Sequence, residues 1–444
     1  MSVYEIQGGR TLRGRLRIQG AKNSVLPILA AALLAPGQSV IRNCPRLSDV
    51  DAALRILEVL GCQVRRQDHV VTVDAAGLCR SAIPEELMGE MRSSVIFLGA
   101  LLARTGEAEL SYPGGCELGP RPIDLHLSAL RALGAVISEE NGLLTCRSVH
   151  KKGRDLFLPI PSVGATENII LAACSCTGTT TLVGAAREPE IGDLQNFLNA
   201  MGARVSGAGT TVISVEGGRP LHGADYTVMG DRIAAATCLC AVGAAGGEVE
   251  LTGADPAHLG AVLSALEEAG SVIGTGPGLI TLKQNGPLRG ISPVRTAPYP
   301  GFPTDGQAVL MAALCTGCGT TMIQENMFDS RYRHVDELRR MGAAISTGGR
   351  TAVVTGVEGA LHGAPVRCTD LRGGAALVVA GLAARGVTTV RELHHIRRGY
   401  EDLAGSLAVL GAGIRELPSR QNRRYRWQQE TTDDADAEAA SAFL

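Results

Sequence analysis

The sequence predicts an α/β protein made of six copies of one βαβαββ-type unit, three copies in each of two domains. Three observations predict this fold class: a short glycine phrase recurs at nearly constant spacing, an Ala-rich apolar segment opens each copy, and strand-like hairpin patterns follow the glycine. A repeat of this length indicates one supersecondary unit that buries its apolar face against its neighbours.

The recurring phrase is Leu-Gly-Ala or a close variant. Its six glycines lie 68 to 73 residues apart, at Gly61, Gly134, Gly202, Gly270, Gly342 and Gly411. Residues 49–60 and 124–133, which precede two of these glycines, carry apolar side chains three and four positions apart. The spacing predicts amphipathic helices, and the glycine that follows predicts their ends.

An almost wholly apolar segment opens each unit. These segments are residues 25–35, 95–103, 168–176, 233–242, 308–315 and 375–384. Because a helix that is apolar on every side must be buried, we expect six central helices.

Hairpins close the units, for example residues 63–73, turning near Gln67 and Asp68, and residues 204–215, turning at residues 207–209. The sixth unit lacks its last strand, whereas the strand-like residues 3–6 have no helix of their own. We therefore expect the two ends to pair. This predicts one domain at residues 21–229, a second at residues 1–20 and 230–418, and a substrate site between them.

The composition excludes several classes of function. With 444 residues, 45% of them hydrophobic, the chain is globular. A net charge of -2 and 3% aromatic residues argue against nucleic acid as the main partner. The apolar run at residues 25–36 is too short for a membrane span and too far from the start for a signal peptide, so we expect no membrane partner and a cytoplasmic location.

The twelve cysteines do not form a disulfide framework in our interpretation. Most lie inside apolar segments, as reduced core residues do: Cys174, Cys176, Cys238, Cys240 and Cys315. Cys315 and Cys318 form a C-x-x-C without a second ligand pair, which disfavours zinc. Residues 419–444 carry charge blocks of opposite sign without apolar periodicity, and we expect a disordered tail there.

Cations stand near the starts of several buried helices, where they are poor caps and oppose the helix dipole. Lys22, Arg92 and Arg372 are the clearest cases, and we expect that at least some of them bind an anion. Arg121, Arg331 and Arg398 lie on the second loops of their units, where carboxylate or phosphate recognition competes with structural ion pairing. The acids Asp49, Asp124 and Glu401 have a simple explanation as first-turn helix residues.

A thiol stands in the segment Tyr-Pro-Gly-Gly-Cys-Glu-Leu-Gly-Pro-Arg-Pro, residues 112–122. Glycine and proline exclude helix and strand there, so we expect the side chain of Cys116 to be exposed and free to react. No G-x-x-x-x-G-K or G-x-S-x-G motif competes with this site. The pair His394 and His395 is expected on a surface loop rather than at a metal.

Six motifs, in order, resemble the UDP-N-acetylglucosamine 1-carboxyvinyltransferase family of enolpyruvyl transferases. They are Gly20-Ala-Lys-Asn23, residues 113–126 around Cys116, residues 161–166, residues 186–190, residues 295–305 and Arg398-Gly-Tyr-Glu401. The resemblance covers about residues 3 to 417. It implies an inside-out α/β barrel in each domain and, without cofactor or metal, transfer of the enolpyruvyl group of phosphoenolpyruvate to the 3-hydroxyl of UDP-N-acetylglucosamine. It also implies a role in peptidoglycan synthesis, cell shape, the cell cycle and cell division, and labelling by the antibiotic fosfomycin.

The resemblance also implies residue roles. Cys116 matches the residue that donates a proton to the methylene carbon and forms a covalent adduct, and Asp305 matches the acceptor of the sugar hydroxyl proton. The phosphoenolpyruvate contacts implied are Lys22, Asn23, Arg121 and Arg398. The UDP-N-acetylglucosamine contacts implied are Arg92, Arg121, Pro122, Ile123, Asp124, Leu125, Ser162, Val163, Gly164, Asp305 and Met327.

Two alternatives remain. The sister reaction on shikimate 3-phosphate uses the same fold but lacks the Pro-Gly-Gly-Cys loop, and a non-catalytic nucleotide-sugar-binding homologue is a second alternative. Two positions depart from the family: Arg397 stands where an acid is usual, which could change the field around Arg398, and Ala234 replaces a common glutamate.

Overall fold

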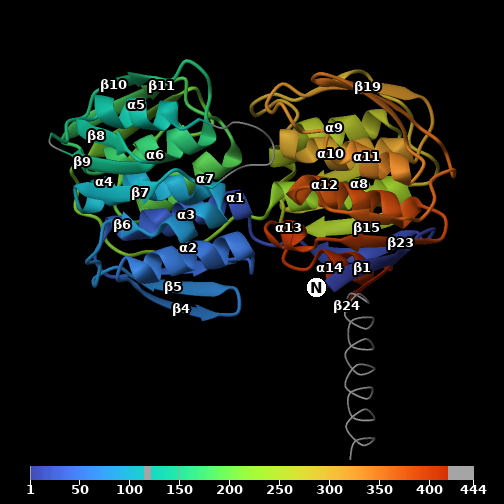
Figure 1. The fold of residues 1–444 in the computed structure, drawn as a ribbon, viewed down its shortest axis with the longest axis horizontal. Coiled ribbons are helices and arrows are strands. Elements are labelled where there is room, and N and C mark those ends of the chain that lie inside the picture. The colour runs from blue at the N-terminus through green and yellow to red at the C-terminus, as the bar shows by residue number, and fades with distance from the viewer. Residues whose placement is uncertain (1, 115–121, 149, 419–444) are drawn as a thin grey trace, which may run out of the picture.

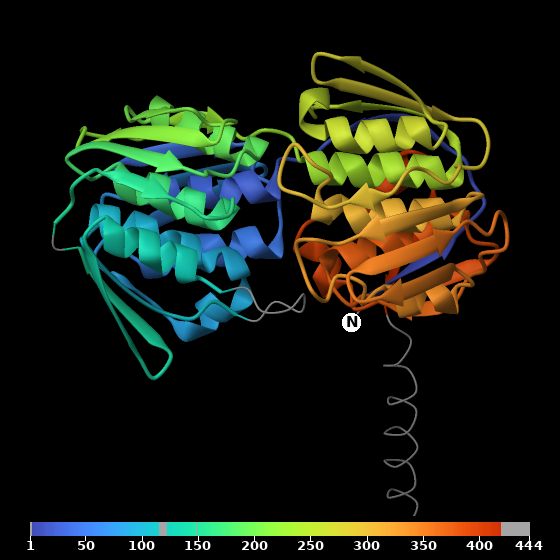
Figure 2. The same cartoon turned by 90° about the horizontal axis from the view of Figure 1, so that it is seen from above.

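The computed structural model describes residues 2–114, 122–148 and 150–418. Two globes lie side by side, and the N-terminal strands belong to the globe that contains the C-terminal half of the chain (Figures 1 and 2). The predicted site residues Cys116 and Arg121 and the predicted tail lie outside the described residues. Among the described helices, none is long and apolar enough to cross a membrane.

The outer layer of each globe consists of sheets. The described strands form six four-stranded sheets, and each sheet has one parallel pair at one edge and two antiparallel pairs. The first globe has the orders β14-β3-β5-β4, β6-β7-β9-β8 and β10-β11-β13-β12. The second has β16-β17-β15-β2, β18-β19-β21-β20 and β22-β23-β1-β24. One topology in six sheets agrees with the sixfold repeat of the sequence.

The strand bounds follow the predicted hairpins. The strands of the first globe are β3 Gln38–Arg42, β4 Gln63–Gln67, β5 Val70–Asp74, β6 Ala82–Ile83, β7 Glu107–Ser111, β8 Ala135–Glu140, β9 Leu143–Ser148, β10 Asp155–Phe157, β11 Gly178–Val183, β12 Arg204–Ser206, β13 Val212–Gly217 and β14 Asp225–Thr227. Those of the second are β1 Ser2–Gln7, β2 Leu12–Arg17, β15 Gly247–Thr252, β16 Val272–Gly276, β17 Leu279–Gln284, β18 Val294–Arg295, β19 Thr320–Gln324, β20 Ala344–Gly348, β21 Thr351–Thr355, β22 Pro365–Arg367, β23 Val387–Arg391 and β24 Gly413–Pro418.

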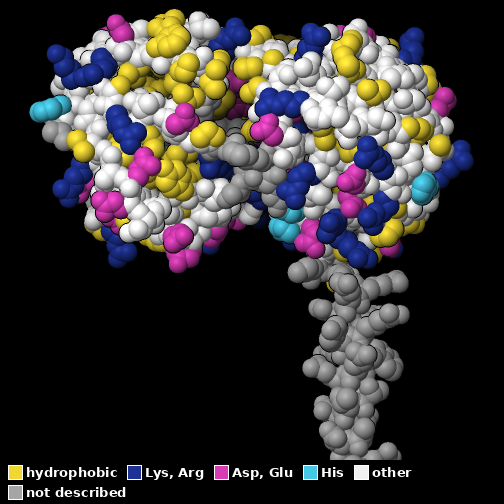
Figure 3. Space-filling model, turned by 45° about the horizontal axis from the view of Figure 1, so that its top comes forward, with side chains coloured by type: hydrophobic (Ala, Val, Ile, Leu, Met, Phe, Trp, Pro, Cys, Tyr) yellow, Lys and Arg dark blue, Asp and Glu magenta, His cyan; other side chains and the backbone are white. Residues whose placement is uncertain are grey.

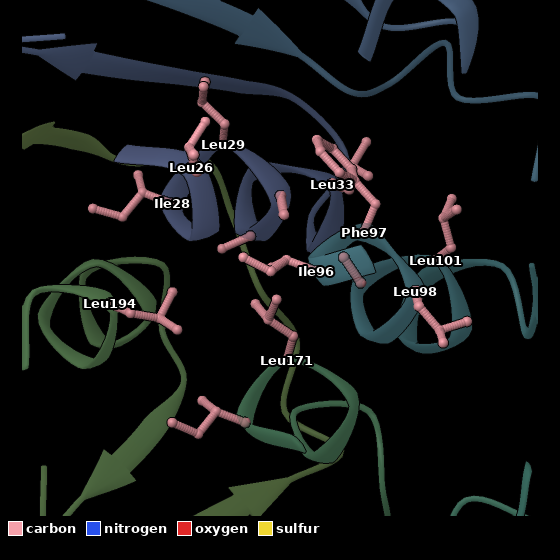
Figure 4. Close-up of a cluster of buried hydrophobic side chains, with 14 of the residues drawn as sticks. Leu26, Ile28, Leu29, Leu33, Ile96, Phe97, Leu98, Leu101, Leu171 and Leu194 are labelled. Atoms are coloured by element: carbon pink, nitrogen blue, oxygen red, sulfur yellow. The ribbon is translucent and has the colours of Figure 1, made fainter. Parts of the chain in front are cut away.

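The predicted apolar helices lie at the centre of each globe. They are α1 Lys22–Ala31, continued by the 3-10 turn η1 Ala32–Leu34; η2 Arg92–Ile96 with α4 Phe97–Arg104; α6 Val163–Ala173; α8 Arg232–Ala245; α10 Thr304–Cys315; and α12 Leu371–Ala383. In Figure 4, Ile96 of η2 and Leu171 of α6 point toward one another between the central helices, whereas Leu29 of α1 points toward the strands that cover them. The helices begin three to five residues before most of the apolar segments, because their first turns are polar.

Outer helices and short turns connect the strands. They are α2 Ser48–Val59, α3 Glu85–Glu90, α5 Asp124–Ala132, α7 Pro189–Ala200, η3 Pro256–Leu259, α9 Gly260–Glu268, α11 Val335–Arg340, α13 His394–Arg397 and α14 Leu403–Val409. The six repeat glycines follow α2, α5, α7, α9, α11 and α14, each with a φ between +92° and +105°. This left-handed conformation favours glycine, which is why the phrase recurs.

Two strands lie next to the points where the chain crosses between the globes. β2 pairs in parallel with β15 of the second globe, and β14 pairs in parallel with β3 of the first. The chain segments that cross between the globes are hydrogen-bonded to each other: the amide of Ala21 donates to Met229 O and that of Asp231 donates to Gln19 O, both at 2.8 Å. The two crossings therefore form one paired connection.

The expected pairing of the two ends is confirmed. β1 lies antiparallel to β24, with Tyr4 opposite Glu416 and Ile6 opposite Ile414, so β1 completes the sixth unit. Figure 1 shows this blue strand within the orange-red part of the second globe. Two separate hydrophobic cores lie on either side of the predicted domain boundary.

The expectation for the cysteines is confirmed, and the one for the pair His394 and His395 is not. The five cysteines expected in the core are buried free thiols, as predicted. The expected surface loop at His394 is wrong, because His394 and His395 lie in the short helix α13. His394 is exposed there, and the two rings stack with centroids 4.0 Å apart.

Candidate active site

A buried carboxylate joins two predicted cations across the junction of the globes. Lys22 begins α1, and its Nζ lies 2.6 Å from Asp49 Oδ2 in the first turn of α2. From the second globe, Arg398 Nε donates to Asp49 Oδ1 at 2.9 Å. The structure thus brings together two of the predicted phosphoenolpyruvate contacts, which share one counter-ion.

The charges of this group are interdependent. Burial, opposed by the neighbouring Asp49, lowers the pKa of Lys22. Burial alone raises the pKa of Asp49, but the cations of Lys22 and Arg398 outweigh it and the net shift is downward. Asp49 therefore stays ionised and holds both cations at the junction.

Asp305 lies between two arginines of the second globe. It is in the first turn of α10, where Oδ1 accepts a hydrogen bond from Arg331 at 2.8 Å and Oδ2 accepts one from Arg372 at 3.1 Å. Burial by itself raises the pKa of Asp305. The cations of Arg372 and Arg331 outweigh burial and hold the pKa well below its usual range, and Lys22 adds to this lowering. The carboxylate is thus ionised at neutral pH, and its side chain is 29% exposed.

Arg372 connects this carboxylate to the core of the second globe. It begins α12 as a buried residue, and its guanidinium donates to Tyr400 Oη at 3.2 Å. Tyr400 Oη also lies 2.7 Å from Thr237 Oγ1 in α8. Asp231 caps α8 by accepting from the amides of residues 233 and 234, and it also accepts the amide of Lys22 at 3.2 Å. The starts of α1, α8, α10 and α12 are therefore close together.

A second set of contacts crosses the junction beside this group. Arg232, buried at the start of α8, donates from Nε to Glu190 Oε1 of α7 at 2.9 Å. The amide of Tyr299 donates to Glu188 Oε1 at 3.2 Å. In Figure 3, side chains of both charge signs border the junction between the two globes. The motif at residues 186–190 thus joins the two globes in this structure.

The predicted nucleotide-sugar contacts of the first globe lie at the starts of α4, α5 and α6. Ser162 caps α6 by accepting the amide of Ala165, and Val163 and Gly164 form the first turn of that helix. Arg92 begins η2 and donates to Pro113 O at 3.3 Å. Asp124 is exposed at the start of α5, preceded by the exposed Pro122 and the buried Ile123, and followed by the half-buried Leu125. Asn23 is half-buried beside Lys22.

Met327 of the second globe is held by a glutamate that sequence reasoning missed. Glu325 is fully buried, and its Oε1 accepts from Thr296 Oγ1 and from the amides of Met327 and Phe328. Its Oε2 accepts from Thr304 Oγ1 at 3.0 Å, next to Asp305. No motif marks Glu325, although a single acid directly after the apolar strand β19 is a signal for such a role.

Two sequence interpretations change. Asp49, explained as a helix-dipole residue, is the shared counter-ion of Lys22 and Arg398. Arg397 turns away from this group: its guanidinium donates to Ser2 Oγ at 2.8 Å and pairs with Glu416. The exposed side chain of Arg397 is thus directed at the terminal strands rather than at the charges around Arg398.

The described residues contain no group of three or more His, Cys, Asp or Glu side chains that could hold a metal ion. The arrangement of cations at helix starts can instead bind small anions directly, because fixed guanidinium and ammonium groups need no reorganisation. An ionised carboxylate close to them can accept a proton from a hydroxyl.

Comparisons with known proteins agree with this arrangement. A family model described as EPSP synthase (3-phosphoshikimate 1-carboxyvinyltransferase) matches residues 6–407. A protein of Caldanaerobacter subterraneus subsp. tengcongensis named UDP-N-acetylglucosamine 1-carboxyvinyltransferase 2 is 48% identical over 93% of this chain and 99% of its own length. A Symbiobacterium thermophilum protein named UDP-N-acetylglucosamine 1-carboxyvinyltransferase 1 is also 48% identical, over 93% and 94%.

Solved structures agree as well. The enolpyruvyl transferase NikO from Streptomyces tendae matches with a TM-score of 0.84 and 27% identity, over 94% of this chain and 99% of that one. EPSP synthase from Acinetobacter baumannii matches with a TM-score of 0.72 and 20% identity, over 94% and 100%, which bears on the fold alone. The predicted inside-out α/β barrel fold is thereby confirmed.

Proposed function

Because the chain belongs to the EPSP synthase family of enolpyruvyl transferases, and within it to the UDP-N-acetylglucosamine 1-carboxyvinyltransferases, we propose that it transfers the enolpyruvyl group of phosphoenolpyruvate to the 3-hydroxyl of UDP-N-acetylglucosamine. Phosphate is the second product. One observation carries this proposal: Lys22 and Arg398 share Asp49 at the junction, close to an Asp305 that two arginines keep ionised.

Lys22 and Arg398 are suited to the anionic groups of phosphoenolpyruvate. In the substrate-free protein both cations contact Asp49. A phosphate or carboxylate group entering between them takes over part of this contact. Lys22 and Arg398 are thus already desolvated and oriented by Asp49 before the substrate binds, which is the advantage of a preorganised site. Asn23 and Arg121 complete the proposed contacts.

Asp305 and Cys116 are proposed to move the protons. The sugar oxygen attacks C2 of phosphoenolpyruvate, Asp305 takes the hydroxyl proton, and the Cys116 thiol gives its proton to C3. Loss of phosphate and of one C3 proton restores the double bond. The arginines that keep Asp305 ionised also make it a weak base, so the transfer is favoured when C3 protonation has already made C2 electron-poor.

The acceptor sugar is proposed to lie against the starts of α4, α5 and α6, with Arg92, Asp124 and Ser162 to Gly164 as contacts, and against the backbone of Met327. The shikimate 3-phosphate alternative is less well supported, because the EPSP synthase structure is 20% identical whereas the two named relatives above are 48% identical. We also propose a cytoplasmic enzyme of cell-wall synthesis, needed for cell shape and division. Its buried free cysteines suit a reducing compartment.

The test is release of inorganic phosphate from phosphoenolpyruvate. We expect release with UDP-N-acetylglucosamine and none with shikimate 3-phosphate. Release with shikimate 3-phosphate alone would contradict the proposed acceptor. Binding of the nucleotide sugar without release in either mixture would support a non-catalytic homologue.

The role of Cys116 is tested by mass spectrometry after exposure to fosfomycin. We expect the intact chain to gain one adduct and the variant Cys116→Ser to gain none. Equal labelling of both proteins contradicts the role proposed for Cys116. Cys79, which is exposed in the same globe, is the matched control, and Cys79→Ser should label like the unchanged chain.

A further inference from the structure

His69 and Glu401 meet across the junction of the two globes. His69 lies in the turn between β4 and β5 of the first globe, and its Nε2 is 2.8 Å from Oε1 of Glu401. Glu401 belongs to the segment between α13 and α14 of the second globe. Three residues earlier, the same segment carries Arg398, which donates to Asp49 of the first globe. Two contacts of complementary chemistry therefore attach one short segment to the other globe.

The first globe holds the His69 turn rigidly against α2. Asp68 has a φ of +51°, and its carbonyl accepts from Arg66 Nε at 3.3 Å. The same guanidinium donates from Nη1 to Asp51 Oδ1 at 3.0 Å, in the first turn of α2. Because that turn of α2 also carries Asp49, the two groups that face the second globe, Asp49 and His69, are fixed relative to each other.

The second globe holds the Glu401 segment from its other side. Gln19 is bonded to it twice, since Nε2 donates to Gly399 O at 3.0 Å and Oε1 accepts the amide of Glu401 at 2.9 Å. Tyr400 points into the core and accepts from Arg372, the arginine that also contacts Asp305. The segment thus connects the junction contact to the catalytic carboxylate.

We propose that His69 is a positioning residue that seats the 398–401 segment, and with it the guanidinium of Arg398, for binding of phosphoenolpyruvate. This inference rests on the proposed function. Without His69 the segment contacts the first globe through Asp49 alone, whereas two contacts three residues apart fix how the segment is oriented toward that globe. His69 itself is about half exposed, with 53% of its side-chain surface accessible, and it touches none of the proposed substrate-binding side chains through a described hydrogen bond.

The kinetic test uses three variants. In His69→Ala we expect the KM for phosphoenolpyruvate to rise about threefold to tenfold, the range of an ordinary hydrogen bond, because His69 is half exposed. The KM for UDP-N-acetylglucosamine and kcat should stay within about twofold. His69→Gln keeps an N–H donor and should restore most of the affinity. His222→Ala, an exposed histidine whose Nδ1 lies 3.0 Å from Gly223 O, is the matched control and should behave like the unchanged chain.

A second measurement needs no substrate. Hydrogen exchange of the amides of residues 399–401 should be faster in His69→Ala than in the unchanged chain and normal in His69→Gln. Unchanged exchange in His69→Ala, or equal KM increases for both substrates, overturns the proposal. Absence of phosphate release by the unchanged chain contradicts the proposed function alone, because the exchange result still decides whether His69 seats this segment.

Discussion

In the first globe, α1 begins with a lysine and has no capping side chain, whereas in the second globe Asp231 and Asp370 cap α8 and α12. The same difference holds for the charges beside these helices. Asp305 is paired with two arginines of its own globe, whereas Asp49 is paired with Lys22 of its own globe and with Arg398 of the other globe. The repeat places helix starts at equivalent positions, and the side chains on them decide whether a buried carboxylate is paired with cations of one globe or of both.

The largest expected effect comes from removing the carboxylate of Asp305, whose two arginines belong to its own globe. In Asp305→Asn the side chain keeps its shape but cannot take a proton, so kcat should fall by about 100-fold to 10,000-fold. Steady-state phosphate release measures the change, and circular dichroism checks the fold. Asp336→Asn, an exposed carboxylate on α11 of the same globe, is the control. A kcat of Asp305→Asn within tenfold of the unchanged chain would falsify the assignment.

Lys22 tests the other side of the comparison, the carboxylate that is shared between the two globes. Hydrogen bonds to charged groups contribute about 1.5–3 kcal/mol, so Lys22→Gln should weaken phosphoenolpyruvate binding by about 10-fold to 150-fold. Isothermal titration calorimetry measures the affinity. Lys283→Gln, which removes an exposed lysine paired with Glu248, should bind normally. Equal affinities of Lys22→Gln and Lys283→Gln would show that Lys22 is a structural ion-pair partner only.

Two buried glutamates extend the comparison to stability. Burial, and next Glu190 and Glu188, raise the pKa of Glu167 in the first globe well above its usual value. Its folded form therefore keeps a proton that the unfolded form loses above about pH 4.3, and stability falls as pH rises toward the raised pKa. Glu167→Gln removes this loss, so its free energy of unfolding relative to that of the unchanged chain should increase from pH 5 to pH 8, by at most about 1.4 kcal/mol per pH unit, and its Tm should rise with it.

Glu325 of the second globe is the matched comparison. Its carboxylate accepts four hydrogen bonds, so Glu325→Gln should lower Tm at every pH in that range, because an amide nitrogen cannot accept them. Calorimetric scans of both variants at several pH values give the answer. A Tm difference for Glu167→Gln that does not change with pH contradicts the protonated state of Glu167.

The smallest effect is expected at Arg397. Its guanidinium is half exposed and pairs with Glu416, and exposed pairs contribute little. Arg397→Ala should change kcat/KM by less than about twofold, whereas the neighbouring Arg398→Ala should raise the KM for phosphoenolpyruvate strongly. If both variants raise that KM equally, Arg397, which stands where the family usually has an acid, does affect phosphoenolpyruvate binding.

Local patterns allowed much of the fold to be predicted. The apolar segments and the six glycines carry their information within a few residues, so the buried helices, the hairpins and the pairing of β1 with β24 were all predictable. The helix starts were placed too late because the polar first turns, such as Lys22 and Asn23, do not match an apolar pattern.

Long-range partners set the limit for the site. Asp49 meets Arg398, which is 349 residues away in the sequence, so a helix-dipole explanation was sufficient until the fold brought them together. Glu325 belongs to no motif, and its role depends on four donors from three separate positions of its unit. The direction in which Arg397 points depends on the terminal strands, which no local pattern near residue 397 reveals.

Because Ser2 lies opposite Pro418 in the pairing of β1 with β24, the described chain nearly closes on itself. The arrangement of the six units in space therefore does not depend on which unit comes first in the polypeptide. A short linker between these strands, with new termini opened at the exposed residues Gly209 and Thr210 between β12 and β13, leaves every strand pairing in place. With such a linker the backbone would be a closed loop of six units, three in each globe, that crosses between the globes twice. A circularly permuted chain is therefore expected to keep the same fold.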